Sequence, residues 1–119
     1  KKKIVICDRF TDSTIAYQHF GMGVNLKIIK LMNNFLLKDI KISFTFLNIV
    51  NKKNLVLRLK KRKSLNRYDQ FNVKFYNNVQ KGFLKLSKLK KQSYQIINSN
   101  LSIKVNENII LDRIKKLIK

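Results

Sequence analysis

Short apolar runs alternate along the chain with longer stretches in which apolar residues recur every three or four positions. The run KIVIC at 3–7 is bounded by charged residues, which is typical of a buried strand. The runs ISFTFLNIV at 42–50 and YQIIN at 94–98 are rich in β-branched and aromatic residues, which favour extended backbone. The pattern therefore predicts strands at these three places.

Helical spacing of apolar residues predicts helices at 14–20, after Asn25, at 52–61, at about 69–91 and at 105–118. Ser13 is placed to cap the first helix, and Gly21 and Gly23 to end it. A basic turn near 62–67 separates the third helix from the fourth. The apolar stripes of the second, fourth and fifth helices are Ile28, Ile29, Met32, Phe35 and Leu36; Phe71, Phe75, Val79, Phe83 and Leu86; and Ile109, Ile110, Ile114 and Leu117.

Strands separated by helices pair in parallel through right-handed crossovers, so the predicted class is α/β, with a parallel sheet flanked by helices. With 119 residues and 45% hydrophobic content, the chain has room for one domain with a real core. We expect all of 1–119 to belong to that domain. Ligands of such sheets bind at the carboxyl ends of the strands.

The charge is strongly basic, with 27 Lys and Arg against 6 Asp and Glu and a net charge of +21. This balance favours polyanionic partners such as nucleic acid. Abundant Lys, Asn and Ile with no Pro is also what AT-rich coding produces, and this interpretation carries somewhat more weight. The sequence has no zinc finger, no RNP-type aromatic platform and no recognisable helix-turn-helix.

The single cysteine and the single histidine indicate no chemistry of their own. Cys7 cannot form an internal disulfide, which fits a cytoplasmic protein, and no Cys/His cluster suggests a metal site. His19 has no carboxylate at helical spacing, so we interpret it as a surface or loop residue rather than a base. No apolar stretch reaches the roughly 20 residues needed to cross a bilayer.

Candidate chemistry is concentrated in CDRFTDSTIAYQ at 7–18, which closes and follows the first predicted strand. Asp8 and Arg9 then stand at the carboxyl edge of the sheet. Arg9 can offer a planar fork of donors to a phosphate, and Asp8 can orient that fork or accept from a metal-bound water. Spacing alone supports a strand-end ion pair of the two equally well.

The order of these residues resembles thymidylate kinase of the bacterial type. The run VICDRFTDSTIAYQ is followed by a glycine-containing turn, TFL, and RKSLNRYDQFNVKFYNNVQKGFLKL, and the likeness covers nearly the whole chain. Its most specific part is the DR-[FYH] motif joined to S-T-x-A-Y-Q. The resemblance implies a P-loop nucleoside-monophosphate kinase that uses ATP and Mg²⁺ to convert dTMP to dTDP, working as a homodimer built from the 13–37 region.

The resemblance also implies roles for residues of the acceptor site. Arg9 resembles the arginine that contacts the acceptor phosphate and aligns the two nucleotides. Ser13 and Thr14 resemble residues that line the thymine site, with Thr14 the better candidate for a hydrogen bond to the base. Tyr17 resembles the aromatic residue beside the sugar, and Gln18 a neighbour of the base. The bland alternatives are core packing for Tyr17 and a helix cap for Ser13.

The basic stretch at about 58–69 resembles the family's lid, whose arginines reach the phosphates of ATP. Arg58, Arg62 and Arg67 are the candidates for this contact, and Arg62 and Arg67 are the best candidates for a catalytic role beside Arg9. A solvated basic helix end is the structural alternative for each of them. Phosphoryl transfer depends on positioning and positive charge around the moving group, so arginines are the expected residue type.

Some family features are missing from the sequence. It contains no phosphate loop G-x-x-x-x-G-K-[ST], so the resemblance is to the C-terminal part of the kinase, and the expected fold is incomplete. Asn66 and Asp69 replace the usual lid acids, and Ile42-Ser43 replace Pro-Asp. We therefore expect the isolated segment to be inactive and poorly soluble, because its sheet would have an open edge. A non-catalytic kinase remnant and a basic nucleic-acid-binding module are the alternatives.

Overall fold

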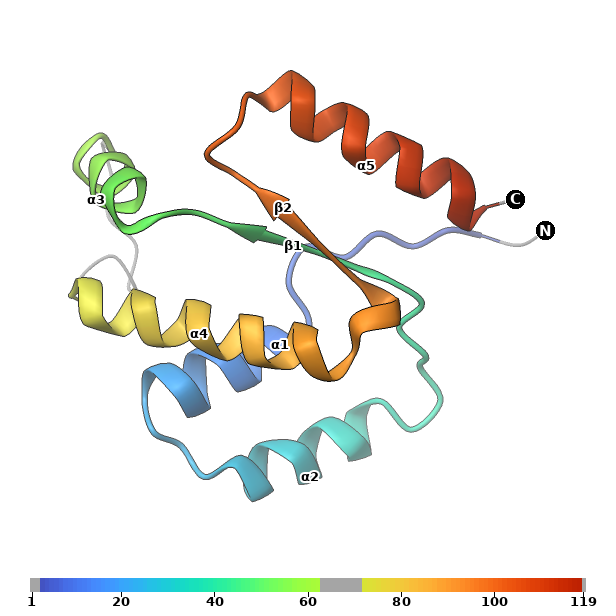
Figure 1. Ribbon diagram of the computed structural model, residues 1–119. Helices are drawn as coiled ribbons and strands as arrows, with labels where there is room; N and C mark the ends of the chain where they lie inside the picture. Colours follow the sequence, from blue (N-terminus) through green and yellow to red (C-terminus); the bar gives the residue numbers. More distant parts are fainter. Residues whose placement is uncertain (1–2, 63–71, 119) are drawn as a thin grey trace.

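The computed structural model describes residues 3–62 and 72–118 (Figure 1). The first helical region is the single turn α1 (Thr11–Thr14), which continues as the π-helix η1 (Ile15–Gly21). The other elements, in chain order, are α2 (Leu26–Leu36), β1 (Thr45–Ile49), α3 (Lys52–Lys60), α4 (Val73–Leu89), the 3-10 turn η3 (Lys91–Ser93), β2 (Tyr94–Asn98) and α5 (Ile103–Leu117).

The two strands β1 and β2 pair in parallel, from Thr45 opposite Tyr94 to Ile49 opposite Asn98. The helices α3 and α4 separate them in the sequence, so the predicted parallel α/β class is confirmed. In Figure 1, α5 lies on one side of the strands, and α4, α1 and α2 follow one another on the other side. Among the described helices, none is long and apolar enough to cross a membrane.

The core lies mainly where α4 packs against η1. One cluster joins Ile15, Ile29 and Leu86, and a second joins Ala16, Phe75 and Val79. The two helical segments approach closely because a glycine stands on each side. A Cβ atom at Gly82 would lie 2.5 Å from the Phe20 ring, and one at Gly21 would lie 2.5 Å from the Phe75 ring.

Side chains at the helix starts explain why four helices begin where they do. The caps of α2, α3, α4 and α5 each accept a hydrogen bond from a backbone N–H two or three residues further on; they are Asn25, Asn51, Asn72 and Ser102. Because Ser102 caps α5, this helix begins at Ile103 rather than at the predicted residue 105. Leu117, which was predicted to belong to the apolar stripe of this helix, is exposed.

The predicted strand at 3–7 is wrong for this structure. The segment has no regular secondary structure, and Ile4, Val5 and Ile6 are 70%, 86% and 87% exposed. A strand needs a neighbour to satisfy its backbone N–H and C=O groups. In the described part of the chain, β1 and β2 pair with each other, and neither pairs with this segment.

Smaller corrections concern the ends of elements. Ser13 is not a cap: α1 already begins at Thr11, and the Ser13 N–H donates to the Phe10 carbonyl at 2.8 Å. The strand predicted at 42–50 is only Thr45–Ile49. The helix predicted at 69–91 is described from Val73, and the predicted basic turn at 62–67 lies outside the described residues after position 62.

His19 does not lie in a loop but within η1. Its Nδ1 is 2.8 Å from the carbonyl oxygen of Val24, which can only accept, so Nδ1 carries the hydrogen. The Gly23 N–H donates to the His19 carbonyl at 2.9 Å, and Gly23 has a φ of +78°. His19 therefore stabilises the turn that ends the π-helix. The helix ends at Gly21, one of the two glycines predicted to end it.

Candidate functional site

Arg9 stands at the junction between the exposed N-terminal segment and α1. It is the one non-glycine residue in the described part of the chain with a positive φ, at +64°. Backbone in this left-handed region costs a non-glycine residue about 1–3 kcal/mol and is concentrated at functional sites. The side chain folds back along the helix, so that Nη2 donates to the Tyr17 hydroxyl at 3.1 Å.

Tyr17 is fixed by α4. Its ring makes edge-to-face contacts with Phe75 and Phe83, at centroid distances of 6.0 and 6.3 Å. The Arg9 Cζ atom lies over this ring, 4.9 Å from its centroid. Tyr17 thus packs against the core, which was the structural alternative considered from the sequence, and it also contacts Arg9, while its predicted place beside the sugar stays a prediction.

The other predicted acceptor residues lie on the same short segment. Thr14 is exposed, and Ser13 and Gln18 are half-buried. Gln18 follows Thr14 by four residues, a spacing that brings side chains to one side of a helix. Asp8 is exposed and makes no ion pair with Arg9, so the strand-end ion pair considered from the sequence is wrong.

Asp12 is a residue of this segment that sequence reasoning missed. Its carboxylate accepts hydrogen bonds from the Lys90 ammonium group, at 3.1 and 3.2 Å, and from the Tyr94 hydroxyl. Burial, and then the hydrogen bond and negative charge of Asp12, raise the pKa of Tyr94 well above its ordinary value. The partners lie 78 and 82 residues away in the sequence, so no local pattern indicated them.

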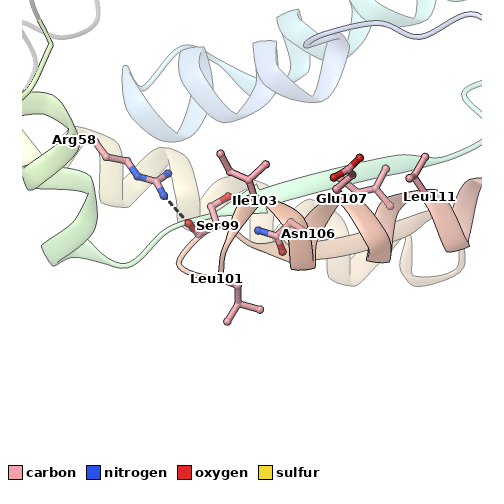
Figure 2. A pocket seen from close by; sticks show the side chains of 8 residues that line it. Arg58, Ser99, Leu101, Ile103, Asn106, Glu107 and Leu111 are labelled. Carbon is pink, nitrogen blue, oxygen red and sulfur yellow. Dashed lines mark hydrogen bonds between the residues drawn. The ribbon is translucent and has the colours of Figure 1, made fainter.

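Arg58 lies at a second place, near the carboxyl ends of the strands. Its guanidinium donates to the carbonyl oxygen of Ser99 at 2.5 Å, just after β2, as the dashed line in Figure 2 shows. It borders a pocket of about 470 Å³ whose other lining is mainly apolar. The lining residues are Arg58, Ser99, Leu101, Ile103, Asn106, Glu107, Ile110 and Leu111.

The remaining lid candidates are placed only in part. Arg62 is exposed two residues after α3, and its backbone N–H donates to the Leu59 carbonyl. Arg67, with Asn66 and Asp69, lies outside the described residues. The structure brings Arg9 and Tyr17 together, whereas Arg58 contacts Ser99 at the pocket beside α5.

A network of asparagines, also missed from the sequence, holds the loops beside Arg58. Asn100 Oδ1 accepts from the Asn51 N–H at 3.2 Å and from Asn54 Nδ2 at 2.9 Å. Asn100 Nδ2 donates to Asn98 Oδ1 at 2.7 Å, and Asn106 Nδ2 donates to the Asn98 carbonyl at 3.0 Å. The loop after β1 is thereby tied to the loop after β2, which fixes one wall of the pocket.

Comparison with known proteins identifies the family. The family model described as thymidylate kinase matches residues 1–110. The chain belongs to the thymidylate kinase family. It is 34% identical to the thymidylate kinase of Wolbachia sp. subsp. Brugia malayi (strain TRS) over 117 residues, which covers 98% of the chain and 55% of that relative. It is 32% identical to the thymidylate kinase of Trichodesmium erythraeum (strain IMS101) over 115 residues, which covers 97% of the chain and 47% of that relative.

A solved structure agrees with the sequence comparison. The crystal structure of thymidylate kinase from Ehrlichia chaffeensis matches with a TM-score of 0.63 and 30% identity, over 99% of this chain and 52% of that one. The predicted resemblance and the nucleoside-monophosphate-kinase type of fold are therefore confirmed. The chain spans about half the length of the curated relatives it matches.

Proposed function

We propose that the complete protein is a thymidylate kinase that transfers the γ-phosphoryl group of ATP to dTMP and gives dTDP. The observation that carries this proposal is the placement of Arg9, whose strained backbone and contact with Tyr17 hold a guanidinium beside the S-T-x-A-Y-Q helix. A guanidinium has five N–H donors, so the bond to Tyr17 leaves most of them for phosphate oxygens.

In this proposal the segment Asp8–Gln18 forms the acceptor site. Arg9 binds the monophosphate of dTMP and keeps it in line with the incoming phosphoryl group, which is the main catalytic demand of the reaction. Tyr17 presents the ring edge that lies beside the deoxyribose. Thr14, with Ser13 and Gln18, contacts the thymine base, and Asp8 accepts a hydrogen bond from water near the phosphates.

Arg58, Arg62 and Arg67 supply the positive charge for ATP. Arg58 borders a pocket whose volume is within the range of about 300–1,000 Å³ found for small-molecule sites, with apolar side chains suited to a flat base. Mg²⁺, when bound, neutralises phosphate charge. The described residues hold no group of three ligating side chains that would bind a metal. A lid at 58–69 remains part of the proposal.

We also propose a homodimer, with α2 at the interface. Five large apolar residues of this helix are between 55% and 83% exposed: Ile28, Leu31, Met32, Phe35 and Leu36. Contiguous apolar surface of this kind marks interaction sites. Exchanging Leu31 for Glu should convert the dimer to a monomer in sedimentation analysis, whereas exchanging the exposed Lys30 for Glu should leave it intact. A monomeric parent protein would contradict the dimer.

A cytoplasmic location stays a prediction.

The nucleotide specificity can be tested by thermal stability of the complete protein. dTMP should raise the Tm far more than UMP does, because a ligand stabilises in proportion to its binding to the folded state. Formation of dTDP from dTMP and ATP should accompany it. Equal stabilisation by both nucleotides would contradict the proposal. Binding of long polyanions that weakens steeply with salt, without any response to dTMP, would favour the nucleic-acid module instead.

A further inference from the structure

The helix turn α1 has little local support. It is only 4 residues long, its N-cap Phe10 makes no side-chain cap bond, and the segment before it is exposed. Isolated turns of this length are not stable by themselves. Its C-terminal end is held because it continues into η1, so contacts with distant parts of the chain matter most for its first residues.

Asp12 provides such a contact. Its side chain is only 13% exposed, and it receives the Lys90 ammonium group from the end of α4 and the Tyr94 hydroxyl from the start of β2. Charge-assisted hydrogen bonds of this kind are stronger than neutral ones. Tyr94 lies opposite Thr45, the first residue of β1, in the parallel sheet. One carboxylate thus ties α1 to the end of α4 and to the start of β2.

The other ion pairs among the described residues differ from this one. Lys104 with Glu107 and Lys115 with Asp112 each join residues three positions apart on α5, and their side chains are largely exposed. Pairs of that type contribute little to stability. The pair of Asp12 is the long-range one and includes the more buried acid.

The location of Asp12 connects this anchor to the acceptor site. It lies between Arg9 and Ser13 in the sequence, and Tyr17 follows on the same continuous helical segment. The hydrogen bonds of the carboxylate go to Lys90 and Tyr94 and not to Arg9 or Tyr17, so we expect it to act on the substrate through the position of its helix turn. A displacement of about 1 Å at a reacting group can cost about 100-fold in rate.

We propose that Asp12 is a positioning residue of the acceptor site: Lys90 and Tyr94 hold its carboxylate and thereby fix α1, so that Arg9 and the base-contacting residues stand at the correct distance from the acceptor nucleotide. This inference rests on the proposed function. It assigns to Tyr94 and Lys90 an effect on dTMP use although neither touches the nucleotide.

The test compares Asp12→Asn and Tyr94→Phe with the parent in the complete enzyme, at a temperature well below the Tm of each. Asp112→Asn is the matched control, because it removes an exposed acid with an ion pair on α5. We expect the KM for dTMP to rise about tenfold in both test variants, while the KM for ATP changes less than about twofold. The control should keep both values.

Two further measurements separate positioning from stability. Combining Asp12→Asn with Tyr94→Phe should cost no more than the larger single change, because both act on one contact. Lys90→Arg, which keeps the charge, should retain the dTMP KM, whereas Lys90→Met should raise it. If Asp12→Asn fails to fold, the dTMP KM of Tyr94→Phe tests the inference alone, since this change removes one hydroxyl only.

A lower Tm in both variants with an unchanged dTMP KM would overturn the inference and leave the contact purely structural. An equal rise of the KM values for dTMP and ATP would also overturn it. A parent enzyme without dTMP kinase activity would be recognised before any variant is made, and it would remove the proposed function together with this inference.

Discussion

Two apolar segments that lie close together in the sequence differ sharply in burial. Ile15 and Ala16 in η1 are 8% and 0% exposed, whereas Ile4, Val5 and Ile6 remain between 70% and 87% exposed. A helical segment satisfies its backbone hydrogen bonds within itself and needs only a surface to pack on, which α4 provides. A strand needs a second strand at hydrogen-bonding distance. The difference shows that η1 is ordered by packing against α4, whereas the segment at 3–7 has no partner strand in the described part of the chain.

The largest expected effect concerns Arg9, which lies just before α1. Arg9→Ala in the complete enzyme should lower kcat/KM for dTMP about 100- to 1,000-fold, as removal of a charge-stabilising donor does in other enzymes. The free energy of unfolding should hardly change, because Arg9 is exposed and its replacement by Ala removes few buried contacts. Steady-state kinetics and urea unfolding check both parts. Lys116→Ala, an exposed cation on α5, serves as the control, and an equal loss there would refute a specific role.

A matched pair of substitutions tests the comparison itself. Ile15→Ala should cost about 2–5 kcal/mol of unfolding free energy, because it opens a cavity in the core. Ile6→Ala removes the same atoms from an exposed side chain and should stay within about 0.5 kcal/mol. Urea denaturation measures both. Equal costs would mean that Ile6 is covered in the protein tested, by a strand or another chain, and the contrast drawn above would fail.

A smaller effect is expected at the close contact of α4 with η1. Gly82→Ala places a Cβ atom against the Phe20 ring and should destabilise by about 1–3 kcal/mol. The neighbouring Lys81 is exposed, and Lys81→Ala should be nearly neutral. Thermal unfolding of both variants measures this difference in stability. A stabilised Gly82→Ala variant, as helix propensity alone predicts, would show that the two helical segments can move apart.

The smallest effect is a dependence on alkaline pH. Burial, with Asp12 as its hydrogen-bond acceptor, raises the pKa of Tyr94 above the ordinary value of 10.0. The neutral hydroxyl is favoured in the folded state, so this stabilisation is complete below pH 10 and is lost as the pH rises above it. Lys90 is the other charged group beside Asp12. Tm measured from pH 9 to 11 should fall more steeply in the parent than in Tyr94→Phe; parallel curves would argue against this linkage.

Much of the local structure was predictable. The strand at 94–98 has the predicted bounds, α2 begins directly after Asn25, and α3 begins at Lys52, as predicted. The candidate acceptor residues could be proposed because Asp8 to Gln18 form one continuous motif. The roles of Ser13, Thr14 and Gln18 stay predictions, as does the lid at 58–69, most of which lies outside the described residues.

What the sequence could not supply were the contacts between distant residues. Nothing near Asp12 indicates Lys90 or Tyr94, and nothing near Arg58 indicates Ser99. The same holds for the asparagine network, whose members looked like surface residues of a lysine- and asparagine-rich chain.

The sequence by itself determined the helix periods, the strand at 94–98 and the family motif, because these depend on residues within a few positions of one another. Only the tertiary structure decided which apolar runs are buried, which acid anchors α1 and which group Arg58 meets. Those outcomes depend on which segments come together in space, and the physical reason is that strands, buried ion pairs and pockets are made of groups that the chain must first bring into contact.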